Sequence, residues 1–232
     1  MSDAREPAPA AGARMWRAGL AARTAWLLAF VIVVAGLPML ADKSVYDHVW
    51  RDRLYDQDWA RLLRVMGFVP TWLVAAIALW LHERDADRPR ATRRAWFLAI
   101  APAAAGLIGE LLKLLLRRER PDVLNGLYSF RPWSDQPFST VGLAWPSSHT
   151  MVAFGAATAL TLLLPRAKWV WFLLAAGCGA TRVLARAHFL SDVTLGALMG
   201  WSVGWGCWFV FAKRGEMRGS GEKRDRAASG ES

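Results

Sequence analysis

Two histidines, several cations and an aspartate of this chain fall in three short clusters whose residue types suit phosphoryl transfer. The clusters are KLLLRRERP (113–121), WPSSH (145–149) and TRVLARAHFLSD (181–192). Phosphoryl transfer needs cations to neutralise the phosphate oxygens, a nucleophile in line and an acid to protonate the leaving oxygen. The clusters together predict a phosphate site that needs neither a metal ion nor another cofactor.

The third cluster carries the expected nucleophile. His188 and Asp192 are four residues apart, so on a helical turn their side chains can meet. An aspartate that accepts from one imidazole nitrogen fixes the tautomer and leaves the other nitrogen free to attack. A continuous helix would separate Arg182 from His188 around its axis, so we expect a break near Arg186. Arg186 itself is expected to face solvent or headgroups. Taken alone, such a loop is more often structural than catalytic.

The first cluster supplies cations. Lys113 and Arg120 are seven residues apart, which on a helix places them along one face, and Pro121 is expected to stop that helix. Two cations that snorkel at the end of a membrane span are the alternative. Glu110 lies three residues before Lys113 within an apolar segment, where a carboxylate suggests a function. It either pairs with Lys113 and aims it or has a structural role.

The second cluster precedes an apolar run. Ser147 and Ser148 are good helix N-caps, and the free N–H groups at a helix start bind anions. Ordinary capping explains both serines but not His149. The loop between the first two clusters holds Arg131 and several aromatic residues, which either shape a headgroup entrance or pack the loop; the aromatic residues are Tyr128, Phe130 and Trp133.

Apolar runs separate these clusters in a chain of 232 residues that is 54% hydrophobic. A helix needs about 20 residues to cross the hydrocarbon core of a bilayer. We therefore predict an all-α fold, a bundle of six transmembrane helices, with a soluble bundle of buried helices as the alternative. In the last run, glycines at every fourth place predict close approach of another helix. The runs are 25–40, 68–81, 95–112, 151–164, 169–184 and 193–212.

The charges set the expected topology. With both termini in the cytoplasm, more than half of the basic residues fall on the cytoplasmic side, as the positive-inside rule favours. The three clusters then share the outer, periplasmic-type face. The net charge of +10 follows from this topology rather than from nucleic-acid binding. The first apolar run is expected to be an uncleaved anchor rather than a signal peptide. Segment 43–66 is expected to form an amphipathic interfacial helix or a solvated linker. Segments 1–14 and 213–232 are expected to be disordered tails around a membrane domain at 15–212.

The pattern K-x6-R-P, then P-S-x-H, then S/T-R-x5-H-x3-D resembles the signature of the type 2 phosphatidic acid phosphatase family, whose fold is shared with vanadium haloperoxidases. The resemblance implies that His188 is the nucleophile, that Asp192 orients it and that His149 protonates the leaving group. It also implies phosphate binding by Lys113, Arg120, Arg182, Ser147 and the backbone N–H of Ser148. The family most often has glycine where Ser148 stands; serine keeps the N–H donor but adds a side chain and a second hydroxyl.

The resemblance implies a lipid phosphatase of the inner membrane that forms a phosphohistidine and hydrolyses a lipid phosphomonoester or diphosphate. Undecaprenyl diphosphate, phosphatidic acid, phosphatidylglycerol phosphate and a lipid A phosphate fit equally well, because the motifs read only the phosphate. A transporter or lipid-binding protein that holds an anionic headgroup in the basic cluster is the alternative. The oligomeric state cannot be read from the sequence.

Overall fold

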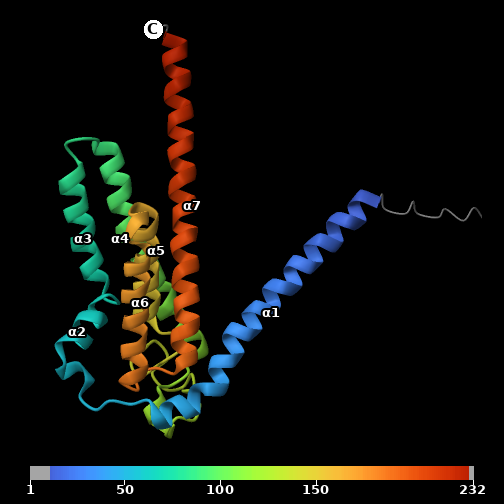
Figure 1. Cartoon of the computed structure of the whole chain (residues 1–232), viewed down its shortest axis with the longest axis vertical. Coiled ribbons are helices and arrows are strands. Elements are labelled where there is room, and N and C mark those ends of the chain that lie inside the picture. The colour runs from blue at the N-terminus through green and yellow to red at the C-terminus, as the bar shows by residue number, and fades with distance from the viewer. Residues whose placement is uncertain (1–10, 230–232) are drawn as a thin grey trace, which may run out of the picture.

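The computed structural model describes residues 11–229, and every regular element within them is a helix (Figure 1). This confirms the all-α class for the described range. Two isolated β-bridges occur in the loop after α4. The long helices are α1 (Ala11–His48), α2 (Asp58–Val65), α3 (Val69–Glu83), α4 (Arg88–Leu116), α5 (Ser148–Leu163), α6 (Lys168–Leu184) and α7 (Leu190–Ser229). Single 3-10 turns lie at η1 (Leu54–Asp56), η2 (Pro121–Leu124) and η3 (Pro165–Ala167).

The first described helix begins at Ala11 and the last ends at Ser229. The disorder expected for segments 1–14 and 213–232 stays a prediction. Residues 1–10 and 230–232 lie outside the described residues. The amphipathic segment expected at 43–66 is shorter as a helix, because α1 continues to His48 and only α2 follows η1.

Two helices of the described chain are long and apolar enough to cross a membrane, namely α4 and residues 190–211 of α7. A third span results if α2 and α3, which are bent by 69° at a short break, count as one. The helix α5 is apolar but shorter, and α6 has 17 residues. The six predicted runs therefore all lie in helices, while six complete spans stay a prediction.

The helix α5 lies at the centre of the bundle and packs against α4, α6 and α7 (Figure 1). The helices α5 and α7 begin at the same end of the bundle, and α4 ends there. Most α5 side chains are small and buried. Small residues allow helix backbones to approach closely in a membrane protein. The loops at this end therefore meet over a tightly packed centre.

The glycines of α7 confirm the close approach that their spacing predicted. A Cβ atom at Gly196 would lie 3.0 Å from the carbonyl oxygen of Ser147, and one at Gly200 would lie 2.3 Å from that of Met151. A Cβ atom at Gly204 would meet Thr158 at 2.7 Å. The glycine row thus sets the distance between α7 and α5, and with it the spacing between the residues at their starts.

Replacing Gly200 by alanine is expected to destabilise the bundle by about 1–3 kcal/mol, the usual cost of overpacking a close contact. The added methyl group would collide with the backbone of α5 rather than with a movable side chain. Gly206→Ala is the matched control, since nothing lies within 4 Å of a Cβ atom there. The measurement is the unfolding midpoint in detergent, and equal midpoints for the two variants would contradict the close packing.

Candidate active site

The three clusters meet at the end of the bundle where α4 ends and α5 and α7 begin. Lys113 lies in the last turn of α4, and its ammonium contacts the first residue of α5, Ser148. The backbone N–H of Ser147 donates to the carbonyl oxygen of Asp192 across 3.2 Å, which joins the starts of α5 and α7. Residues that are far apart in the sequence therefore form one site.

Lys113 is a buried cation held by two acceptors. Its Nζ donates to Glu110 Oε1 at 2.8 Å and to Ser148 Oγ at 2.9 Å, and the side chain is 8% exposed. The pairing of Glu110 with Lys113 is thus confirmed. An ammonium has three donors, so one N–H remains for a further acceptor at this point.

The helical arrangement expected for Lys113 and Arg120 is wrong. The helix α4 ends at Leu116 because Arg117 adopts a left-handed conformation (φ 53°) and its N–H caps the carbonyl of Lys113. Arg120 is therefore outside the helix, extended and exposed, directly before η2, and Pro121 follows too late to be the stop. The Arg120 backbone N–H donates to the carbonyl oxygen of Gly142 at 3.1 Å, which keeps it within the loops above the site.

Ser147 stands at the capping position of α5, but its side chain does not cap the helix. Its Oγ instead accepts from Thr150 Oγ1 at 3.0 Å. Ser147 is fully buried and Ser148 is 8% exposed. The half-buried His149 follows, and its Cβ and backbone pack directly against Gly67. The positive start of α5 thus points its free N–H groups toward the same end of the bundle as Lys113.

The break expected near Arg186 is confirmed. The helix α6 ends at Leu184, Arg186 has a positive φ of 51°, and α7 begins at Leu190. The N–H groups of Ala187 and His188 both donate to the carbonyl oxygen of Arg182, at 3.0 and 3.3 Å. This turn brings His188 back over the end of α6, close to Arg182.

Arg186 does not face solvent or headgroups as expected. Its guanidinium lies over the rings of Tyr46 (4.2 Å to the centroid) and Trp50 (4.7 Å), and it donates to the carbonyl oxygen of Tyr46 at 3.0 Å. Cation–π contacts of this kind favour a partly buried guanidinium. Arg186 therefore fixes the end of α1 and the residues just after it against the turn that carries His188.

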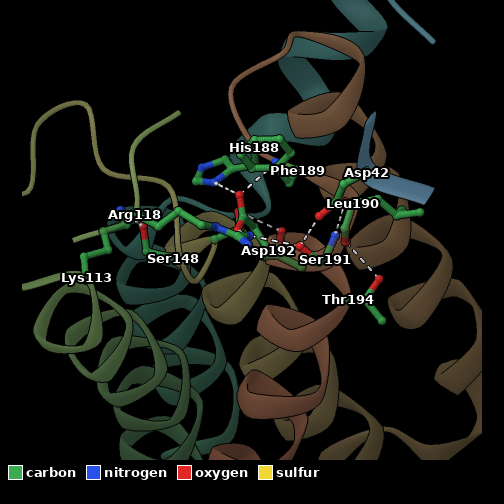
Figure 2. A network of polar contacts seen from close by, with 12 residues as sticks. Asp42, Lys113, Arg118, Ser148, His188, Phe189, Leu190, Ser191, Asp192 and Thr194 are labelled. Atoms are coloured by element: carbon green, nitrogen blue, oxygen red, sulfur yellow. Dashed lines mark hydrogen bonds and ion pairs between the residues drawn. The ribbon is translucent and has the colours of Figure 1, made fainter. Parts of the chain in front are cut away.

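His188 and Asp192 face one another in the buried centre of the site (Figure 2). The Nδ1 atom of His188 lies 3.6 Å from Asp192 Oδ2 and forms no hydrogen bond with the described residues. Burial, and after it the positive charges of Arg182, Lys113 and Arg120, lowers the pKa of His188 well below its usual value. The imidazole is therefore neutral over the ordinary pH range, the form in which a histidine nitrogen is a nucleophile.

Arg182 is another buried cation of the site, and its side chain is only partly paired. Its Nη1 donates to the hydroxyl of Tyr55 at 2.8 Å, while its buried Nε has no hydrogen-bond partner among the described residues. A buried polar atom without a partner is rare and needs an explanation. An anion at this position would satisfy it.

Sequence reasoning missed Arg118, Asp42 and Tyr55. Arg118 donates to Asp192 Oδ1 and to Ser191 Oγ, and Asp42 accepts from Ser191 (Figure 2). Two signals were available: Arg118 is a second arginine inside the first cluster, and Asp42 is an acidic residue at the end of an apolar run. Neither signal reveals which residues they meet.

Two of the side chains that the sequence suggested either for a headgroup entrance or for loop packing, Arg131 and Trp133, make contacts within the loop. Arg131 pairs with Glu119, with 3.3 Å between its Nε and Oε1, and Trp133 lies under the guanidinium of Arg117. Among the residues that the structure describes, no group of three or more histidine, cysteine, aspartate or glutamate side chains is arranged to hold a metal ion.

Comparisons with known proteins agree with the clusters. The model of the family described as the PAP2 superfamily matches residues 94–216, which include all three. A lipid A 1-phosphatase of Rhizobium johnstonii is 32% identical over 127 residues, covering 51% of this chain and 48% of the relative. The chain therefore spans about half the length of that relative.

Two further relatives are matched over more of their length. The bacitracin transport permease protein BcrC of Bacillus licheniformis is 30% identical over 155 residues, which cover 62% of this chain and 69% of the relative. A decaprenylphosphoryl-5-phosphoribose phosphatase of Mycobacterium tuberculosis is 33% identical over 138 residues, 57% and 67% of the two chains. No solved structure matches significantly.

Proposed function

Because the chain belongs to the PAP2 superfamily, we propose that it is an integral membrane phosphatase that removes phosphate from a lipid phosphomonoester or diphosphate. The observation that carries the proposal is the buried pair of His188 and Asp192 beside two buried cations, one of which has an unpartnered Nε. Two of the relatives are named as phosphatases of lipid-linked phosphates, which supports the same class of substrate.

In the proposed first step, Asp192 orients His188 through Nδ1, and the lone pair of Nε2 attacks phosphorus. The phosphorus–oxygen bond to the leaving group breaks, and His149 donates a proton to the leaving oxygen. The products are a phosphohistidine at residue 188 and the dephosphorylated lipid, or a lipid monophosphate from a diphosphate.

In the second step, a water molecule attacks the phosphohistidine and His149 accepts its proton. The nitrogen–phosphorus bond breaks, inorganic phosphate leaves and His188 is neutral again. Lys113, Arg120 and Arg182 hold the phosphate oxygens through both steps, together with Ser147 and the N–H of Ser148. Charge that develops on these oxygens is stabilised by donors already in place, which is where catalytic gain is largest.

The proposed topology places the site on the outer face. The opposite end of the bundle holds a group of basic residues at the start of α4 and between α5 and α6, as expected for a cytoplasmic side. These residues are Arg88, Arg90, Arg93, Arg94, Arg166 and Lys168. Both termini then lie in the cytoplasm, and a lipid reaches the site sideways from the outer leaflet.

The proposal is tested by incubating the purified protein in detergent with lipid A, phosphatidic acid, phosphatidylglycerol phosphate and polyprenyl phosphates and diphosphates. We expect phosphate release from at least one of them, and we expect EDTA to leave the rate unchanged, since protein cations supply the charge that a metal would. Loss of activity in EDTA that magnesium restores would contradict the proposed mechanism. No release from any substrate would contradict the function.

Transport or simple binding of an anionic lipid is the second candidate, and it is favoured by the name of the relative BcrC, a bacitracin transport permease protein. The two candidates differ in what they require of His188. A phosphatase needs the imidazole as nucleophile, whereas a transporter needs only the cations around it.

A further inference from the structure

Arg118 is a buried arginine with no assigned part in the reaction, and it contacts Asp192 directly. It is 4% exposed, and its Nη2 donates to Ser191 Oγ at 2.9 Å as well as to Asp192 Oδ1 (Figure 2). The guanidinium lies over two rings that contact each other edge to face, 4.7 Å from the centroid of Tyr128 and 4.9 Å from that of Phe189. Two aromatic faces and two acceptors fix both its position and its plane.

Asp42, at the far end of α1, holds the other side of this arrangement. It is 2% exposed and its two oxygens accept from the N–H of Ser191 (2.9 Å) and the hydroxyls of Ser191 and Tyr128 (2.5 and 2.6 Å). Burial, and after it Asp42, raises the pKa of Tyr128 to about 12, so its hydroxyl stays a donor. Ser191 and Tyr128 each contact Arg118 in turn. A continuous network therefore runs from α1 to the site.

The Asp192 carboxylate is fully engaged by this network. Its Oδ1 accepts from Arg118, and its Oδ2 accepts from the Phe189 N–H at 2.8 Å while it faces His188 Nδ1. A buried carboxylate beside an imidazole favours the protonated imidazolium unless its charge is offset. An imidazolium cannot attack phosphorus, so the charge on Asp192 has to be balanced without losing its orientation.

We propose that Arg118 is a positioning residue for the nucleophile: it fixes the Asp192 carboxylate against His188 and balances its charge, so that Asp192 orients the imidazole without protonating it. Only the kinetic part of this inference, the expected loss of turnover, rests on the proposed function. The other charged or titratable groups that act on His188 are Arg182, Lys113, Arg120 and His149. All of these stay in place when Arg118 is replaced.

The test is Arg118→Gln, with His188 titrated by NMR in histidine-labelled protein and its signal assigned through His188→Gln. We expect the pKa of His188 to rise by about one unit, since the Asp192 charge is then unbalanced. We also expect kcat for the best lipid phosphate to fall about tenfold or more while KM changes less than about threefold, because the contact lies behind the nucleophile. The acid limb of the pH–rate profile is expected to move to higher pH together with the pKa of His188.

The neighbouring Arg117 offers a matched control. It is also buried, but it donates to the carbonyl oxygens of Arg131, Pro132, Asp135 and Pro137 in the loop and not to the site. Arg117→Gln is expected to lower the unfolding midpoint while the His188 titration stays as in the wild type. If His188 titrates with the same pKa in Arg118→Gln as in Arg117→Gln, the proposal is overturned.

Arg118→Lys keeps the charge but lacks the planar fork, and it keeps the test decisive if the glutamine variant does not fold. It is expected to leave the His188 titration near the wild-type value and to lower kcat. A wild-type kcat in this variant would overturn the positioning role. The NMR titration needs no turnover, so absence of phosphate release by the wild type would refute the proposed function while the titration still decides the part of Arg118.

Discussion

Replacing His188 by alanine is expected to reduce phosphate release by about a thousandfold or more, the scale seen when an enzyme loses its nucleophile. The imidazole is buried, neutral and turned toward Asp192, and no other described histidine has such a partner. The variant should still bind lipid phosphate, because Lys113 and Arg182 stay in place. The measurements are phosphate release and binding of the lipid substrate by the same preparation.

The control is His82→Ala, which removes an exposed imidazole from α3. It is expected to retain the wild-type rate. A base-stable, acid-labile phosphoprotein should form with the wild type and not with His188→Ala. Unchanged turnover in His188→Ala would refute the phosphohistidine mechanism, and unchanged transport in the absence of any turnover would favour the second candidate function.

Replacing Arg182 by glutamine is expected to reduce kcat/KM by about a hundredfold to a thousandfold, the usual cost of removing one donor that stabilises transition-state charge. The guanidinium is 5% exposed and its Nε has no partner among the described residues, so a donor is left for a phosphate oxygen. The measurement is steady-state kinetics on the lipid phosphate that the wild type hydrolyses best.

Two controls separate the phosphate contact from its support. Arg166→Gln removes an exposed arginine from η3 at the opposite end of the bundle and should leave the kinetics unchanged. Tyr55→Phe removes the hydroxyl that holds Arg182 Nη1 and should cost about threefold to tenfold, the value of one hydrogen bond. A change of less than about threefold in Arg182→Gln would show that the arginine does not bind the phosphate.

The sequence was sufficient to predict contacts between residues that are close along the chain, while the chemical roles of the site residues stay a prediction. The pairing of Glu110 with Lys113 follows from helical spacing, and the break near Arg186 follows from the need to bring Arg182 and His188 together. Both are local arguments. The glycine row of α7 was readable for the same reason, because its period alone implies a close neighbour.

The end of α4 could not be predicted in this way. Proline is a reliable sign that a helix cannot continue, but it sets only the latest possible end. Arg117 enters the left-handed region four residues earlier, which non-glycine residues do rarely, and its side chain compensates by bonding to loop carbonyls. Those loop carbonyls belong to residues up to 20 positions away, so no local sequence pattern predicts where the helix ends.

The hydrogen-bond network around Asp192 could not be predicted from the sequence, for a similar reason. Asp42 and Ser191 are 149 residues apart, and Arg118 and Asp192 are 74 apart. Their types fit many partners, and only the packing of α1 and the loop onto the start of α7 selects these. The sequence can indicate that each of these residues is buried and has a polar partner. It cannot indicate that they are partners of one another.

The bond between Asp42 and Ser191 has a consequence for how the protein is made. The site takes one buried carboxylate from α1 and its proposed nucleophile from the turn before α7, so a growing chain lacks a complete site until α7 has formed and has met α1. Synthesis from the N-terminus therefore places Asp42 in the membrane early and leaves it without its partner until Ser191 arrives. The proposed activity should therefore appear only after Ser191 has met Asp42, late in biogenesis.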